Sequence, residues 1–302
     1  MASIQGVHAA LVTPRRPNAN EADLAAALEL VDFVAGRGVD GIVLLGTTGE
    51  FVHLDVRDRL HLTQFAIKRS RLPVTVNVSH SSLEGALALA RGAASFGASA
   101  LLLMPPYFFR YSQEEIEEFY LRFAKELGPA PPLLVYNIPV VSTAIHFETV
   151  MKLLATGAYA GIKDSSGRIE DFRKMLAVKR QAPFTLLAGA DAIFPETRAE
   201  GGDGVISGVA GALPELMAGL DRAIRLGEEE KRDRLTARLL EFLGWCERLP
   251  PSLPLKEALT IRGVKAGPPA VPLAPEGRSR LEQFREWFGG WLPVVLTESQ
   301  GA

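Results

Sequence analysis

The chain has 302 residues, 47% of them hydrophobic and 23% charged, so it can bury the core of a large soluble domain. Its formal charge is −2 and it holds no basic block, which excludes a typical nucleic-acid-binding surface. A single cysteine excludes an intramolecular disulfide, and neither a secretory leader nor an apolar run of about 18 residues is visible. We therefore expect a soluble, cytoplasmic protein without a membrane span.

Short apolar runs recur along the first 226 residues and alternate with helical patterns. They are continuous rather than alternating, as strands of a parallel sheet covered on both faces should be. About eight such units predict an α/β fold, a (β/α)8 TIM barrel, rather than an open sheet. The predicted strands are Gly6–Val12, Gly41–Leu45, Pro73–Val78, Ala100–Met104, Pro132–Tyr136, Gly161–Asp164, Phe184–Ala188 and Gly204–Ile206.

Helix-start signals lie between these runs. Asn20, with Asp23 three residues later, predicts the start of the first helix. Ser112 and Glu115 form a capping-box pattern ahead of another helix, and the eighth helix is expected over 213–226.

Beyond residue 226 the pattern changes to successive helices without strands. We expect helices over 228–248, 254–262 and 276–291, and frayed residues over 297–302. The chain is thus interpreted as a barrel, 1–226, which carries the active site, and a helical extension, 227–302, packed on it.

In such a barrel the residues just past each strand form the catalytic rim. Lys163 ends the sixth run and can be either a nucleophile toward carbonyl carbon or a strand-end lysine in solvent. The turn at 46–49, Gly-Thr-Thr-Gly, can bind a carboxylate or phosphate or be a plain tight turn. Tyr136 can relay a proton or simply pack at the rim. His80 and the other histidines show no close metal-ligand spacing, so no metal or cofactor is expected, and Cys246 is expected to be inert outside the barrel.

Several motifs in this order resemble the dihydrodipicolinate synthase / N-acetylneuraminate lyase family. They cover the barrel and part of the helical extension, and three of them fall at predicted strand ends. The segments that carry the resemblance are 10–14 (Ala-Leu-Val-Thr-Pro), 46–50 (Gly-Thr-Thr-Gly-Glu), 136–139 (Tyr-Asn-Ile-Pro), 161–164 (Gly-Ile-Lys-Asp), 204–207 (Gly-Val-Ile-Ser) and 253–256 (Leu-Pro-Leu-Lys).

The resemblance implies a class I aldolase with pyruvate and an aldehyde as substrates. Lys163 matches the lysine that forms a Schiff base with pyruvate, and Tyr136 matches the proton relay. Thr47 and Thr48 match the pair that binds the pyruvate carboxylate and orients the tyrosine, Thr48 being counted among the catalytic residues. Further substrate contacts are expected from rim residues, namely Gly46, Asp191, Ile206 and Ser207. The family also implies a homotetramer or homodimer, to which the aromatic cluster at 107–109 could contribute.

Two departures bear on the second substrate. Dihydrodipicolinate synthases hold a substrate carboxylate with an arginine where this chain has Val141, expected to be buried, and use a second tyrosine where it has Phe108. A valine cannot pair a carboxylate and a phenylalanine has no proton to relay. We therefore expect the family's 2-oxo acid aldolases and dehydratases to be the nearer relatives.

The leading hypothesis is a pyruvate-dependent lyase that cleaves or forms a 2-oxo-3-deoxy sugar acid or a 4-hydroxy-2-oxo acid. Hydroxyls of that acid could contact Ser165 and Asp191, and also the serine and threonine side chains at 142, 143, 166 and 207. The alternatives are dihydrodipicolinate synthase, a 2-oxo sugar-acid dehydratase and a pyruvate-binding protein without turnover. A metal-dependent aldolase using His80 is a further possibility.

Overall fold

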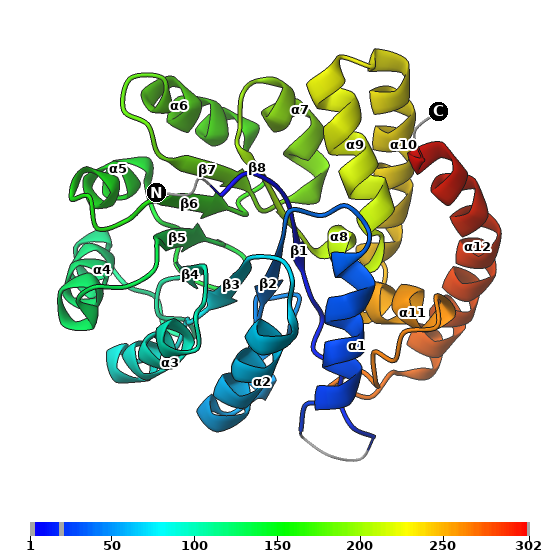
Figure 1. Cartoon of the computed structure of the whole chain (residues 1–302), viewed down its shortest axis with the longest axis horizontal. Coiled ribbons are helices and arrows are strands. Elements are labelled where there is room, and N and C mark those ends of the chain that lie inside the picture. The colour runs from blue at the N-terminus through cyan, green and yellow to red at the C-terminus, as the bar shows by residue number, and fades with distance from the viewer. Residues whose placement is uncertain (1–3, 18–20, 301–302) are drawn as a thin grey trace.

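The computed structural model describes residues 4–17 and 21–300. Within these residues, eight parallel strands form a closed barrel in chain order, and the last strand pairs with the first (Figure 1). This confirms the predicted (β/α)8 barrel. The strands are β1 (Gly6–Ala10), β2 (Gly41–Leu44), β3 (Val74–Asn77), β4 (Ala100–Leu103), β5 (Leu133–Asn137), β6 (Gly161–Asp164), β7 (Thr185–Ala188) and β8 (Gly204–Ser207).

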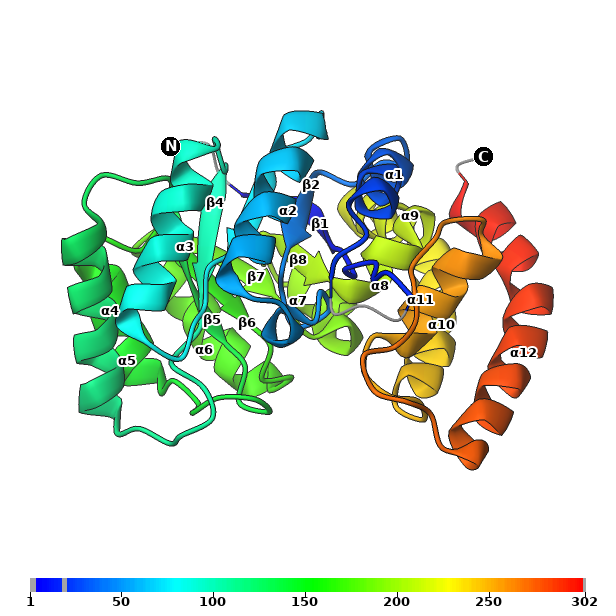
Figure 2. The same cartoon turned by 90° about the horizontal axis from the view of Figure 1, so that it is seen from below.

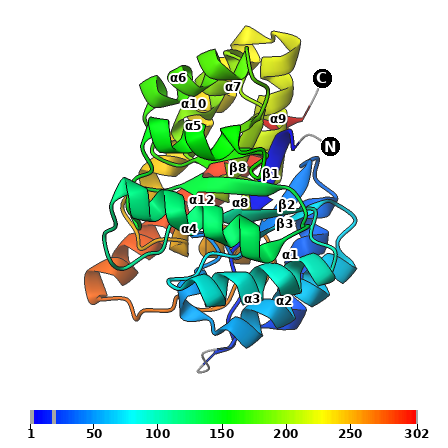
Figure 3. The same cartoon turned by 90° about the vertical axis from the view of Figure 1, so that its left-hand side faces the viewer.

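Helices cover the outer face of the barrel, as Figure 3 shows for the side where α2 to α5 lie. The strands are therefore buried on both faces, which explains why they read as continuous apolar runs. The barrel helices are α1 (Leu24–Ala35), α2 (Val56–Arg69), α3 (Leu83–Ser95), α4 (Gln113–Leu127), α5 (Phe147–Ala155), α6 (Ile169–Lys179), α7 (Phe194–Ala199), α8 (Gly208–Ala212) and α9 (Pro214–Leu226), with short 3-10 turns η1 (Phe51–His53) and η2 (Asp191–Ile193).

Strand register places the predicted catalytic side chains together. Tyr136 on β5 is the partner of Lys163 on β6, and paired residues of a parallel sheet point to the same face. The next pair, Asn137 and Asp164, therefore points to the opposite face, where the Asn137 amide donates a hydrogen bond of 2.7 Å to the Asp164 carboxylate.

Helix starts follow the sequence signals in one case and differ in another. Ser112 and Glu115 form the predicted capping box of α4, with both reciprocal hydrogen bonds present. The first helix instead begins after Asp23, whose side chain accepts from the Ala26 N–H, while Asn20 lies outside the described residues. Asp23 can cap the helix because a carboxylate directly before the first helical turn accepts hydrogen bonds from N–H groups that have no intrahelical partner.

The expectation of a single helix over 213–226 is wrong at its start. A short helix, α8, forms first, and the Ser207 hydroxyl caps it by accepting from the Ala210 N–H at 2.9 Å. Pro214 then begins α9, since proline lacks an N–H and suits the first helical position. The sequence Gly-Val-Ala-Gly-Ala gives α8 little intrinsic helix preference, so its packing on β1 and α11 accounts for it.

From Glu229 onward the described residues contain three helices and no strand, namely α10 (Glu229–Cys246), α11 (Leu253–Ile261) and α12 (Pro275–Ser299). They stand together along one side of the barrel (Figure 2), and their buried side chains join the same hydrophobic core as those of the barrel. The expectation of fraying from residue 297 is wrong as far as 299. The helix continues through Pro293, and Ser299 is buried because Gly219 of α9 leaves room for its backbone.

Candidate active site

A cavity of about 300 Å³ opens at the carboxyl ends of the strands. Lys163 and Tyr136 both line it, and their side chains are 5% and 1% exposed. The Lys163 ammonium lies 4.2 Å from the centroid of the Tyr136 ring. A lysine head in bulk solvent does not fit this burial. The remaining lining comes from barrel residues Thr47, Thr48, Ile138, Ser165, Gly189, Asp191, Ile206, Gly208 and Val209 and from extension residues Leu243, Cys246, Pro251, Ser252 and Leu255.

The Tyr136 hydroxyl is hydrogen-bonded to the hydroxyl of Thr47. Thr47 Oγ1 lies 3.1 Å from the Tyr136 oxygen, and either atom can donate the hydrogen bond. A chain of hydroxyls next to a buried amine can move a proton between a bound substrate and a neighbouring group. The pair therefore provides the geometry that proton relay requires.

The turn that carries Thr47 and Thr48 is fixed through its carbonyl groups. All five carbonyls from Leu45 to Gly49 accept hydrogen bonds, whereas the N–H groups of Thr47 and Thr48 have no hydrogen-bond partner among the residues described. The donors are Asn77 Nδ2 to Leu45, Gly49 N to Gly46, Glu50 N to Thr47, Ser252 Oγ to Thr48 and Thr13 Oγ1 to Gly49. N–H groups that have no partner at a fixed turn, with the Thr48 hydroxyl beside them, suit an anion such as a carboxylate.

Asp191 lines the same cavity as Lys163. Its Oδ1 atom is buried and has no hydrogen-bond partner in the structure as described, and the same holds for the Ser165 hydroxyl. Burial raises the pKa of Asp191 to about 6, an effect that the nearby Ser207 hydroxyl, the Val209 N–H and the Lys163 ammonium only partly offset. Buried polar atoms without partners, grouped in one cavity, indicate that a polar ligand completes them.

Gly189 at the end of β7 gives these groups their space. A Cβ atom at this position would lie 2.7 Å from Lys163 Cε and would also overlap the Ser165 hydroxyl. The glycine is therefore required for the observed position of the lysine side chain.

Several predicted polar contacts lie elsewhere. Gly46 and Ser207 do not line the cavity, and Ser207 caps α8. The Ser142 hydroxyl donates to the Ile138 carbonyl, Thr143 accepts from the Tyr111 N–H, and Ser166 donates to Asp164. Of the serine, threonine and aspartate side chains proposed to contact substrate hydroxyls, Ser165 and Asp191 are the ones that reach the cavity.

The helical extension forms one wall of this cavity, a contact that the sequence analysis does not predict. Cys246 lies in α10, outside the barrel as expected, but its side chain lines the cavity. Burial raises the pKa of its thiol to about 12, so the thiol stays protonated at neutral pH. The sequence signal was present in the apolar spacing of α10, but the partner of its apolar face could not be read from it.

A second, apolar hollow of about 330 Å³ adjoins the first and shares Thr47 with it. Phe51, Tyr107, Phe108 and Val141 contribute to its walls. Val141 is 42% exposed, so the expectation of a buried valine is wrong, because it lies on the loop after β5 rather than in the barrel interior. Phe108 is 87% exposed and has a left-handed backbone with φ of 85°.

His80 lies after β3, where it was expected, but not in a metal-binding cluster. Its Nδ1 accepts from the Ser82 N–H, and burial followed by the charge of Arg59 lowers its pKa. No group of three His, Cys, Asp or Glu side chains within 4–17 and 21–300 is arranged to hold a metal ion.

Over the same residues, no helix has both the length and the apolar character needed to cross a membrane.

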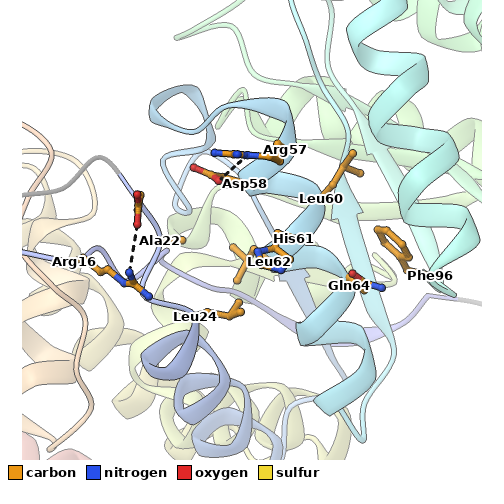
Figure 4. Close-up of a pocket in the computed structure, with 11 residues that line it drawn as sticks. Arg16, Ala22, Leu24, Arg57, Asp58, Leu60, His61, Leu62, Gln64 and Phe96 are labelled. Atoms are coloured by element: carbon orange, nitrogen blue, oxygen red, sulfur yellow. Dashed lines mark hydrogen bonds and ion pairs between the residues drawn. The ribbon is translucent and has the colours of Figure 1, made fainter.

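A larger hollow, about 630 Å³, lies beside α1, α2 and α3 and shares no lining residue with the cavity of Lys163 (Figure 4). Its charged side chains pair with one another, Arg16 with Glu21 and Arg57 with Asp58. The charges of this hollow are thus already neutralised in pairs, and none of these residues lines the cavity that holds Lys163.

Comparison with known proteins gives consistent results along the chain. Residues 3–287 match the dihydrodipicolinate synthetase family. A probable 2-dehydro-3-deoxy-D-pentonate aldolase of Escherichia coli is 32% identical over 226 residues, which cover 73% of this chain and 74% of that protein. A 4-hydroxy-tetrahydrodipicolinate synthase of Chlorobium limicola is 31% identical over 295 residues, which cover 95% of this chain and 98% of that one.

A similar solved structure is that of a prophage protein of Escherichia coli K12, which belongs to the dihydrodipicolinic acid synthase family and was determined in complex with pyruvate. It has a TM-score of 0.87 at 26% sequence identity, covering 95% of this chain and 98% of that chain. The relatives therefore include proteins named for aldol cleavage and proteins named for synthase activity.

Proposed function

The chain belongs to the dihydrodipicolinate synthetase family, and on that premise we propose that it is a Schiff-base-forming lyase that makes or breaks a carbon–carbon bond at C3 of pyruvate. The observation that carries the proposal is the contact between Lys163 and Tyr136, 4.2 Å from nitrogen to ring centroid in a buried cavity. The solved relative with bound pyruvate supports the choice of this 2-oxo acid.

The proposed chemistry begins when Lys163 Nζ attacks the C2 carbonyl of pyruvate. The unpaired N–H groups of Thr47 and Thr48, together with the Thr48 hydroxyl, would hold the carboxylate of pyruvate during this step. Tyr136 would pass a proton to the oxygen at C2, so that water leaves and a protonated Schiff base forms. Loss of a C3 proton then gives an enamine, whose C3 attacks an aldehyde carbon. In the reverse direction the C3–C4 bond of a 4-hydroxy-2-oxo acid breaks, and the aldehyde leaves.

The aldehyde end of the cavity favours hydroxyl groups over a second carboxylate. Apart from Lys163, none of the cavity residues described above is basic, and Asp191 contributes a carboxylate of its own. A substrate carboxylate placed there would meet a like charge without a partner. Hydroxyls, by contrast, can donate to Asp191 and exchange hydrogen bonds with Ser165. We therefore propose a 2-oxo-3-deoxy sugar acid as the substrate class.

Borohydride trapping tests the first half of this proposal. Incubation with pyruvate and sodium borohydride should add one reduced pyruvyl group per chain, which peptide mapping should locate at Lys163. The Lys163→Met variant should take up none. Lys256, a second buried lysine, is a matched internal control and should stay unmodified because it is ion-paired with Glu50. A wild-type protein that remains unlabelled at saturating pyruvate would overturn the proposal.

A substrate panel separates the remaining alternatives. We expect pyruvate release from at least one 2-oxo-3-deoxy sugar acid and no condensation of pyruvate with aspartate semialdehyde. If pyruvate condensed with aspartate semialdehyde faster than any sugar acid was cleaved, the chain would be a synthase, as several relatives are named. Loss of water without pyruvate release would make it a dehydratase. Labelling of Lys163 without turnover of any compound would make it a pyruvate-binding protein.

We also propose that the chain forms a homodimer, or a homotetramer built from two dimers, through the apolar surface near the cavity. Phe108, Phe109, Val52 and Val140 are exposed on this surface, and burying such a group of side chains favours association. Sedimentation of the wild type should give an oligomer, and Phe108→Asp should shift it toward the monomer. An unchanged sedimentation coefficient in this variant would place the interface elsewhere.

A further inference from the structure

A buried ion pair connects the barrel with the helical extension behind the threonine turn. The Lys256 ammonium on α11 pairs with the Glu50 carboxylate, and the two side chains are 2% and 13% exposed. Glu50 and Lys256 belong to two separate sequence motifs, at 46–50 and 253–256. The structure brings these motifs into direct contact.

This placement is unusual in two respects. Burial lowers the pKa of Lys256, and the partnership with Glu50 offsets this only in part. Taking both charges out of water removes much of the stability that their attraction supplies. Glu50 in addition has a left-handed backbone with φ of 52°, which a residue with a side chain seldom adopts. Stability alone is therefore a poor explanation for this pair.

The start of α11 contacts the threonine turn at a second point, through Ser252. Ser252, just before α11, donates its hydroxyl to the Thr48 carbonyl at 2.9 Å. The Lys256 N–H donates to the Ser252 carbonyl at 3.0 Å, so the two residues are linked through one helical turn. On the barrel side, the Glu50 N–H donates to the Thr47 carbonyl at 3.0 Å. Ser252 thus contacts the Thr48 backbone directly, and Lys256 is connected to the Thr47 backbone through Glu50.

We propose that Glu50, Lys256 and Ser252 are positioning residues through which α11 sets the geometry of the Thr47–Thr48 turn, and with it the affinity for the carboxylate of pyruvate. This inference rests on the proposed function, since it assigns the turn to that carboxylate. α11 lies between α8 and α12 (Figure 1), so the whole extension holds it in place.

Neutral, similarly shaped variants test the pair. Glu50→Gln and Lys256→Met each leave one buried charge without its partner, whereas the double variant removes both charges. Ser252→Gly removes the hydroxyl at a position whose φ of 63° suits glycine. The matched control is Glu257→Gln. Glu257 follows Lys256 on α11 but pairs with Arg285, a half-exposed residue of α12, and does not reach the turn.

The measurement is the rate of borohydride trapping as a function of pyruvate concentration, together with the melting temperature. Both single variants, the double variant and Ser252→Gly should raise the half-saturating pyruvate concentration about tenfold or more. Their maximal trapping rate should stay within about threefold of wild type, because Lys163 is untouched. The double variant should melt above the single variants, and Glu257→Gln should bind pyruvate like wild type.

A purely structural pair gives a different pattern. In that case the double variant regains both its melting temperature and the wild-type half-saturation, and Ser252→Gly leaves half-saturation unchanged. Either result overturns the proposal. Failure of the proposed function itself is distinguishable, since the wild-type protein would then give no adduct at any pyruvate concentration.

Discussion

Replacement of Asp191 by asparagine should stabilise the protein at neutral pH. Burial raises the pKa of this carboxyl from 3.8 to about 6, so the folded state holds its proton more tightly than the unfolded state does. Below about pH 4 both states are protonated and burial of the group costs little. As the pH rises through about 6, the folded state must bury the charge, and stability is lost.

The size of the effect follows from the shift. A difference of about two pKa units corresponds to about 3 kcal/mol in the free energy of unfolding, which is an upper limit because Asp191 is partly exposed. Asparagine has a similar shape and stays neutral at every pH. The advantage of the variant over wild type should therefore be near zero at pH 4 and grow to as much as about 3 kcal/mol at pH 7.5.

Urea unfolding of both proteins between pH 4 and 7.5 measures this difference. Asp221→Asn is a suitable control, because Asp221 is also buried but pairs with Arg198 and Arg225. Its replacement should destabilise the protein, since it leaves Arg198 without its carboxylate partner. If Asp191→Asn gave no gain at pH 7.5, or a gain that did not depend on pH, the assignment of a burial cost to this carboxylate would be wrong.

Three further predictions concern the cavity. Gly189→Ala should keep the fold but displace the Lys163 side chain, and trapping with pyruvate should slow by about 100-fold; a wild-type rate would contradict the close fit. Tyr136→Phe keeps the ring but removes the hydroxyl bonded to Thr47, so steady-state kcat should fall by about 10²- to 10⁴-fold with little change in melting temperature. An unchanged kcat would mean that another group relays the proton. Cys246→Phe should place a larger side chain in the cavity at the wall formed by α10, and should reduce kcat/KM for long substrates more than for short ones. Trapping by pyruvate alone is the control and should change little.

The barrel could be predicted from the sequence because its signals are local. Each strand is a short apolar run that ends in a turn, and the order of the runs determines the pairing in a closed parallel barrel. The proximity of Tyr136 and Lys163 follows from the same logic, because each ends one of two neighbouring strands. The burial of Lys163, on which its chemical role depends, required the surrounding structure.

The contributions of the extension could not be predicted in this way. Apolar spacing indicates that α10 has a buried face, but it does not say which surface that face covers. Cys246 was therefore expected to be remote from the chemistry, although it lines the cavity. The pairing of Glu50 with Lys256 is likewise a contact between distant segments, and neither residue carries a local signal for the other.

The position of α11 in the chain has a consequence for biosynthesis. The ribosome produces the threonine turn early, but Ser252 and Lys256, which contact it, only after all eight strands. A nascent chain can thus close its barrel while the anion-binding turn still lacks its outer support and the cavity lacks one wall. Such a half-made protein exposes the apolar side chains that α8 and α9 later bury against the extension. In the interval before α11 and α12 emerge, this apolar surface therefore lacks its native cover.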